Sequence, residues 1–216
     1  MLHFPESTFA GKRIPKEEFY RNMDFTTTQR RAFVDGIENI LWRNVISEQT
    51  LNVSKGEKVS QIDVLQINLK RKEYNKVILN IIEKATPRHL LFILKKDDQF
   101  QLYIHYKEEY QKGRYKIVDA FCTDWLKKNE FHLKIDGLTL DSVYENFVYQ
   151  IAGRRIEKTE GIQLSETIAK AQEIKKITKR ISKLQNRKRK EKQFTFKLKI
   201  ANEIKQLNVK LQEIKQ

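Results

Sequence analysis

The chain has 216 residues, of which 43 are Lys or Arg and 28 are Asp or Glu, so its formal net charge is +15. A hydrophobic share of 39% with 12 Phe excludes a disordered chain, and a single cysteine, Cys122, excludes a disulfide scaffold or a zinc site built from cysteines. The sequence has no apolar stretch near the roughly 20 residues of a membrane span and no signal-peptide layout at its start, so we expect a soluble, cytoplasmic protein.

Two helices are predicted near the N-terminus. Pro15, which is tolerated in a first helical turn, opens a short helix that carries Phe19 and Tyr20. The hydroxyl groups of residues 26–28 can cap a second helix. Apolar side chains at helical spacing extend this second helix to residue 41, namely Phe33, Ile37, Ile40 and Leu41.

Strand patterns dominate the middle of the chain. Residues 62–69 carry apolar side chains at both parities, which predicts a strand that is buried on both faces or contains a bulge. A helical pattern over 73–84 stops before Pro87, because the residue before a proline disfavours the helical region. The continuous apolar run 90–94 predicts a central strand, and Asp97-Asp98 predicts a hairpin turn after it.

Residues 100–107 alternate between apolar and more polar side chains, which predicts a strand with one buried and one wetter face. Further strands are predicted at 115–121 and 131–135, followed by a strongly patterned helix over 140–151 that Gly153 is placed to end. We find no βαβ rhythm and no Gly-rich phosphate loop. The predicted fold class is therefore α+β, with an antiparallel, meander-like sheet and helices packed on one of its faces.

The last part of the chain differs in charge and pattern. Residues 154–216 contain 19 Lys or Arg against 7 Asp or Glu, whereas residues 1–153 contain 24 against 21, so we place a domain boundary after Gly153. Residues 164–216 read as one long helix or as a helical hairpin folded at 187–193, with two apolar seams at coiled-coil spacing. The seam residues are Ile174, Ile177, Ile181, Leu184, Ile200, Ile204, Leu207, Leu211 and Ile214.

Short segments in a fixed order resemble those of one bacterial family. They are Phe4-Pro5-Glu6-Ser7-Thr8, Ile14-Pro15-Lys16, Ile40-Leu41-Trp42, Asn52-Val53, Pro87-Arg88-His89-Leu90-Leu91-Phe92, Tyr106-Lys107, Thr123-Asp124-Trp125-Leu126, the run Asp141-Ser142-Val143-Tyr144-Glu145-Asn146 continuing to Ala152, Glu191-Lys192-Gln193-Phe194, and Asn202-Glu203-Ile204-Lys205. Through them the chain resembles, almost end to end, the domain-of-unknown-function family numbered 4391. Thr86 departs from the pattern, because an aliphatic residue is expected before Pro87.

This resemblance implies an α/β body with a coiled-coil end. It also implies an accessory subunit of restriction-like, DNA-centred antiviral defence, because members tend to be encoded beside helicases and DNA methyltransferases. The biochemical role of the family is not established, so the resemblance transfers no catalytic residue to this chain.

Three weak signals for chemistry remain. A nuclease of the PD-(D/E)xK type needs an acid-x-Lys strand, but the Glu-x-Lys triples all lie in the helical tail and the strand at 62–69 carries one carboxylate, Asp63. His89 and His105 lie on adjacent predicted strands, where they would approach each other in a hairpin, although ordinary structural histidines are the favoured interpretation. Cys122 has no CxxC partner and reads as a small buried residue.

Tyr103 and Tyr106 with Lys107 offer a stacking platform for single-stranded nucleic acid. In the alternation of this strand Tyr106 falls on the apolar face, however, which favours a place in the core.

We therefore predict a non-catalytic accessory subunit without a metal or cofactor, which docks a helicase or DNA methyltransferase through the nine seam residues. Pairing of the seam with a second copy is left open. The alternative is direct, sequence-independent binding of nucleic acid by the basic arm, and a divergent metal-dependent nuclease is a third interpretation. The cations of the nucleic-acid alternative are Lys175, Lys176, Lys179, Arg180, Arg187, Lys188, Arg189, Lys190 and Lys192.

Overall fold

The computed structural model describes residues 4–22, 25–111, 113–127 and 130–215. The chain packs as two units, residues 1–153, which we call the body, and residues 154–216, which we call the arm. Each is described by itself.

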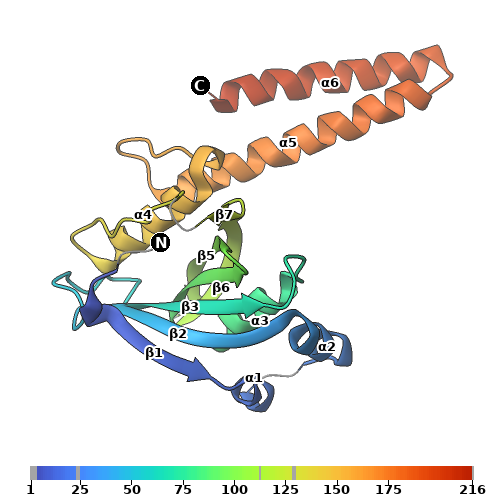
Figure 1. The fold of residues 1–216 in the computed structure, drawn as a ribbon. Coiled ribbons are helices and arrows are strands. Elements are labelled where there is room, and N and C mark those ends of the chain that lie inside the picture. Colours follow the sequence, from blue (N-terminus) through green and yellow to red (C-terminus); the bar gives the residue numbers. More distant parts are fainter. Residues whose placement is uncertain (1–3, 23–24, 112, 128–129, 216) are drawn as a thin grey trace. The chain divides into compact units, whose positions relative to one another are not determined.

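The body is built on a seven-stranded sheet with the order β1-β2-β3-β4-β5-β6, in which β7 pairs with β5 (Figure 1). All neighbouring strands are antiparallel except β3 and β4, which are parallel. The predicted α+β class with a largely antiparallel sheet is confirmed. The strands are β1 (Phe9–Ile14), β2 (Ile37–Ser47), β3 (Gln61–Leu69), β4 (His89–Lys96), β5 (Gln99–Gln111), β6 (Arg114–Cys122) and β7 (Leu126–Lys127), and a short 3₁₀ turn, η1 (Glu6–Thr8), precedes them.

The parallel pair corrects the expectation of a sheet without a βαβ unit. Helix α3 (Val77–Ala85) leaves the end of β3 and returns the chain to the start of β4, so Ile62 lies beside His89 in register. Parallel strands need a crossover of this kind, because a tight turn can join only antiparallel strands. The apolar run of β3 fits this arrangement, since a strand next to a crossover is covered on both faces.

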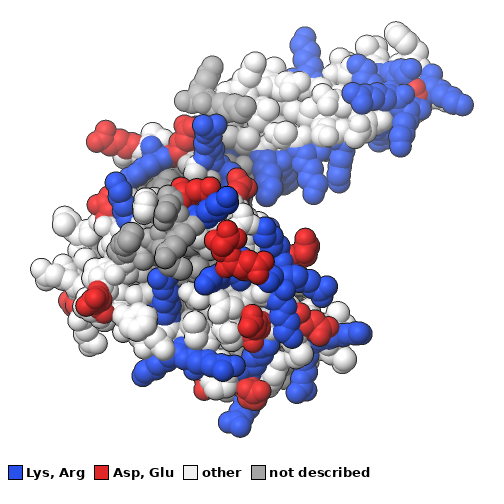
Figure 2. Space-filling view, in the orientation of Figure 1, with Lys and Arg blue, Asp and Glu red and all other residues white. Residues whose placement is uncertain are grey.

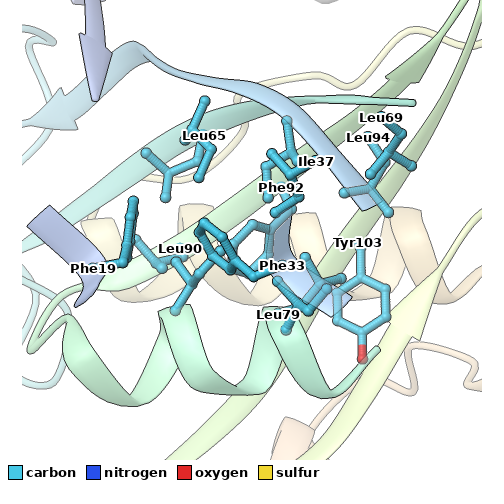
Figure 3. Close-up of a cluster of buried hydrophobic side chains, with 14 residues drawn as sticks. Phe19, Phe33, Ile37, Leu65, Leu69, Leu79, Leu90, Phe92, Leu94 and Tyr103 are labelled. Atoms are coloured by element: carbon cyan, nitrogen blue, oxygen red, sulfur yellow. The ribbon is translucent and has the colours of Figure 1, made fainter. Parts of the chain in front are cut away.

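Helices cover both faces of the sheet, not one face as predicted (Figure 1). The first face carries α1 (Lys16–Asn22), α2 (Thr27–Gly36) and α3, whose side chains share a buried cluster with Leu90, Phe92 and Leu94 of β4 (Figure 3). The other face is covered by α4 (Leu140–Ala152), which packs against β5 and β6. The apolar stripe of α4 has to be buried against a sheet surface. Since α1, α2 and α3 occupy the first face, α4 packs on the other.

Burial on both faces also corrects the prediction for β5. The side chains that were expected to face water, Gln101, His105 and Lys107, are all buried. They tolerate burial because each has a polar partner, for example the carbonyl oxygen of Thr123 for the Gln101 amide. Period-2 alternation identified the strand correctly, but it does not reveal whether the polar face is wet or paired.

Helix α2 is shorter than its apolar stripe suggested. Thr26 caps it as expected, in a capping box with Gln29, but the helix ends at Gly36 and the residues from Ile37 onward form β2. The Ile40 and Leu41 side chains therefore serve a strand that pairs with both β1 and β3. Gly36 is the last residue of the helix, and the β-branched side chains of Ile37 and Ile40 favour a strand.

The strand predicted over 131–135 does not form. The side-chain amide of Gln150 on α4 bonds both backbone groups of Lys134: its oxygen accepts from the Lys134 N–H at 2.9 Å, and its nitrogen donates to the Lys134 carbonyl at 2.9 Å. At Lys134, one side chain thus satisfies both backbone groups that a neighbouring strand would otherwise bond.

Helix α4 is confirmed and is also anchored to a distant loop. The Asp141 carboxylate accepts backbone N–H groups of Glu57 at 2.8 Å and of Val59 at 2.7 Å, and a Cβ added to Gly56 would lie 2.2 Å from Asp141 Oδ1. The loop therefore approaches the helix closely enough to require glycine at position 56.

We expect Asp141→Ala to lower the free energy of unfolding by about 2 kcal/mol, because it removes hydrogen bonds to a charged acceptor. Asp141→Asn keeps one acceptor oxygen and is expected to be less destabilising. Urea unfolding of the two variants measures the difference. Equal stability of Asp141→Ala and the parent chain would show that the carboxylate contributes nothing to the anchoring of this loop.

The arm is an antiparallel pair of helices, α5 (Leu164–Lys190) and α6 (Phe194–Lys215), which follow a 3₁₀ turn, η2 (Gly153–Arg155). Arg180 pairs with Glu203 at 2.8 Å and Glu173 with Lys210 at 2.7 Å, so seven residues along α5 match seven residues back along α6. The hairpin alternative holds, with its fold at residues 191–193. Supercoiling of the two helices stays a prediction.

Candidate functional site

The predicted cations of the arm all lie exposed on its surface. Arg180 connects the two helices of the arm, because its guanidinium donates through Nε and Nη2 to Glu203 Oε1. The strongest concentration is at the turn of the hairpin, where Arg187, Lys188, Arg189 and Lys190 end α5 and Lys192 follows. We call these five residues the tip cations. Figure 2 shows the blue side chains gathered at that end of the arm.

Glu191, the single acid within residues 187–192, stabilises the turn of the hairpin. Glu191 Oε1 accepts the backbone N–H groups of Lys192 at 2.9 Å and of Gln193 at 3.1 Å. The basic last turn of α5 is favourable to the helix, because cations stabilise the negative end of its dipole. This effect is confined to the last turn of the helix, whereas the positive charge continues past the end of α5 to Lys192.

Part of the predicted docking seam is used inside the arm. Four of the nine seam residues are buried and the other five are half-buried. Because the ion pairs bring residue 200 opposite residue 183, Ile200 lies beside Ile181 and Leu184. The hairpin therefore supplies the second helical surface that the seam required. The four buried residues are Ile177, Ile181, Leu184 and Ile200.

The nuclease candidate, Asp63, is held in structural contacts. Its side chain is buried, accepts from Gln61 Nε2 at 2.6 Å, and lies 3.4 Å from the Arg88 guanidinium, which itself lies over the Trp42 ring. Among the described residues, no group of three or more His, Cys, Asp or Glu side chains is placed to hold a metal ion. Cys122 is half-buried rather than buried.

The two histidines of β4 and β5 do not share a site. His89 packs edge-on against Tyr115 and against Tyr144 of α4, with ring centroids 5.2 and 4.5 Å apart. His105 faces the opposite side of the sheet, where it contacts Phe92 and reaches α3. The hairpin thus separates the two imidazoles, because their positions have opposite parity on adjacent strands.

The stacking platform is also absent from the surface. Tyr103 is 4% exposed and Tyr106 is 8% exposed, so neither ring face is open to a nucleotide base. The core position expected for Tyr106 is confirmed. Burial raises the pKa of Tyr103 to about 12.

The sequence interpretation missed a buried polar cluster between α3 and β5, which we call the Glu83 cluster: Asn80, Glu83, His105 and Lys107. His105 Nδ1 lies 3.0 Å from Glu83 Oε2, and His105 Nε2 lies 2.6 Å from Asn80 Oδ1. Lys107 Nζ lies 2.7 Å from Glu83 Oε1 and donates to the Arg88 carbonyl oxygen at 2.7 Å. A signal was present, since Asn80 and Glu83 interrupt the apolar face of a helix at i, i+3 spacing.

The contact between Glu83 Oε1 and Lys107 is ionic rather than hydrogen-bonded. The atoms are close, but the angles do not meet those of a hydrogen bond, so Oε1 has no hydrogen-bond donor among the described residues. On the other side of the sheet the Tyr144 hydroxyl donates to the carbonyl oxygen of His105, and its complete burial raises its pKa. His105 is thus bonded to both helix layers, to α4 through its carbonyl oxygen and to α3 through its imidazole.

A family model described as "Domain of unknown function (DUF4391)" matches residues 2–211. The chain belongs to this family. Searches of curated proteins and of solved structures gave no match. In the described part of the chain, no helix has the length and apolar character of a membrane span.

We expect His89 to make the stability of the body sensitive to mild acid. Burial, and then the charge of Lys107, lower its pKa from 6.5 to about 3. The folded protein therefore keeps His89 neutral at pH values where the unfolded chain takes up a proton. The stability that this residue contributes is complete above about pH 6.5 and decreases as the pH falls, by about 2 kcal/mol at pH 5.

We expect His89→Phe, which keeps a ring against Tyr115 and Tyr144, to remove most of this decrease. Urea unfolding at pH 7.0, 6.0 and 5.0 gives the slope for each protein. The same decrease in both would assign the acid sensitivity to other groups.

Proposed function

We propose that this protein is a non-catalytic subunit whose arm binds the phosphate backbone of nucleic acid without reading its sequence. The observation that carries the proposal is the density of the tip cations, five exposed positive side chains within residues 187–192. Cations near phosphates release condensed counterions, which supplies affinity that depends on salt rather than on sequence.

The geometry of the tip supports this form of binding. Consecutive residues of an α-helix point about 100° apart, since one turn takes 3.6 residues. Arg187 to Lys190 therefore spread around the end of α5 instead of lining one face. A positive end of this kind attracts phosphates from several directions, whereas base recognition requires side chains aimed together into one groove.

The experiment is a titration of the full chain with two labelled DNA duplexes of unrelated sequence, at several salt concentrations. We expect equal affinities for the two duplexes and a linear fall of log K with log salt. A clear preference for one duplex, or no binding at low salt, would contradict the proposal.

A second candidate function, docking of a protein partner, is favoured by apolar side chains beside the tip. Phe194 is 77% exposed and Leu198 is 53% exposed, and their i, i+4 spacing places them on one face of α6. Together with the resemblance described above, this supports an accessory role in DNA-centred antiviral defence with a helicase or DNA methyltransferase as partner. Co-purification of such a neighbour-encoded enzyme should be abolished in Phe194→Ser/Leu198→Ser and retained by a Lys12→Gln control.

A further inference from the structure

The body has a pocket of about 830 Å³ between the end of α3 and the β5–β6 hairpin. This volume lies within the range of about 300–1,000 Å³ that is typical of small-molecule sites. The Glu83 cluster forms part of its wall, because both Glu83 and Lys107 line it. The pocket belongs to the body alone and is distinct from the tip cations.

The charge of the lining favours an anion. Lys84, Lys107, Arg114 and Lys116 line the pocket, and Glu83 is the one acid among the described lining residues. The Glu83 carboxylate lies against Lys107, so these two charges compensate each other, and Lys84, Arg114 and Lys116 give the lining its excess positive charge.

Lys107 is built into the wall as a fixed donor. Its side chain is 3% exposed, and an ammonium group carries three N–H donors. One donor goes to the Arg88 carbonyl oxygen, and the ammonium group lies 2.7 Å from Glu83 Oε1 without a hydrogen bond to it, so donor capacity remains for a ligand. Burial of such a pair is costly, and apolar side chains of similar volume are often at least as stable, so stability alone does not account for the pair.

The aromatic lining favours a ligand with a flat ring. Tyr110 lines the pocket and is 60% exposed, so its ring is open for stacking. Tyr115 lines it too, held in place by its contact with His89 and by a hydrogen bond from its hydroxyl to the Lys58 carbonyl oxygen at 3.1 Å. Stacking on an aromatic side chain is a common way to bind a nucleobase.

From this lining we infer that the pocket binds a nucleoside phosphate. Lys107, Arg114 and Lys116 hold the phosphate, and Tyr110 stacks on the base. The same chemistry is present in a free nucleotide and at the phosphorylated end of a nucleic-acid strand.

Calorimetric titration of the full chain tests the inference with three probes: AMP, inorganic phosphate and a 5′-phosphorylated tetranucleotide. We expect AMP to saturate one site with a Kd below about 1 mM, and phosphate to bind about tenfold more weakly. Arg114→Gln/Lys116→Gln should weaken AMP at least about tenfold, because two charge-assisted hydrogen bonds to the phosphate are removed. Tyr110→Ala should weaken AMP but leave phosphate unchanged.

The matched control is Lys12→Gln/Lys76→Gln, which removes the same charge from exposed positions outside the pocket. A second control, Arg187→Gln/Lys188→Gln, should leave AMP binding intact, so failure of the pocket and failure of the tip are distinguishable. Tetranucleotide binding that is tighter than AMP and depends on Arg114 and Lys116 would identify a strand end as the ligand, and binding of AMP alone would identify a free nucleotide. No saturation by any probe, or equal AMP affinity in the Arg114→Gln/Lys116→Gln variant, would overturn the inference.

Discussion

Glu83→Leu should lower the free energy of unfolding of the body by about 3–5 kcal/mol, because it leaves Lys107 as an unpaired buried charge. The two side chains are almost completely buried, 1% exposed for Glu83 and 3% for Lys107, so the ammonium group left by the substitution is poorly hydrated. The substitution also takes the acceptor from His105 Nδ1. Lys107→Met should be destabilising for the converse reason, since it leaves the Glu83 carboxylate unpaired.

The double variant Glu83→Leu/Lys107→Met allows the interaction energy between Glu83 and Lys107 to be separated from their interactions with other residues. With both charges removed, we expect a destabilisation well below the sum of the two single effects, with a coupling energy of up to about 3 kcal/mol. Urea unfolding of the four proteins closes the cycle. Additive effects would show that the two charges are stabilised independently of each other, in spite of the 2.7 Å that separates them.

The same cycle bears on the pocket. If Lys107 binds a ligand, the double variant should bind AMP more weakly than the parent chain under conditions where both proteins are folded. A pair with a purely structural role would leave AMP binding unchanged.

The sequence predicted best those elements whose signal is local. The stripe of α4, its glycine stop at Gly153 and the hairpin at Asp97-Asp98 all depend on neighbours within a few residues, and all are confirmed. The apolar run of β4 was likewise sufficient to identify a central strand.

The errors arose where a distant partner decides the outcome. Residues 131–135 carry a strand composition, but the backbone of Lys134 bonds the side chain of Gln150 instead of a neighbouring strand. The polar side of β5 was expected to face water, yet Glu83 of α3 lies over it and pairs with His105 and Lys107. The Glu83 cluster was missed for this reason: its members are far apart in sequence, and the crossover helix brings them together.

The tip cations should supply most of the affinity of the chain for DNA. Replacing Arg187, Lys188, Arg189 and Lys190 by glutamine should weaken binding to duplex DNA by about 100- to 1,000-fold at 0.1 M salt, and flatten the plot of log K against log salt by about 0.9 for each phosphate that is no longer neutralised. Glutamine is a good helix former, so circular dichroism should show that the arm stays helical.

The matched control replaces four exposed lysines of the body by glutamine, namely Lys12, Lys55, Lys58 and Lys76. It has the same net charge as the tip variant, +11. If binding depended on net charge alone, both variants would show the same decrease in affinity and in slope. Binding at the tip requires that the control keep the slope of the parent chain, because its cations at the tip still neutralise the same phosphates.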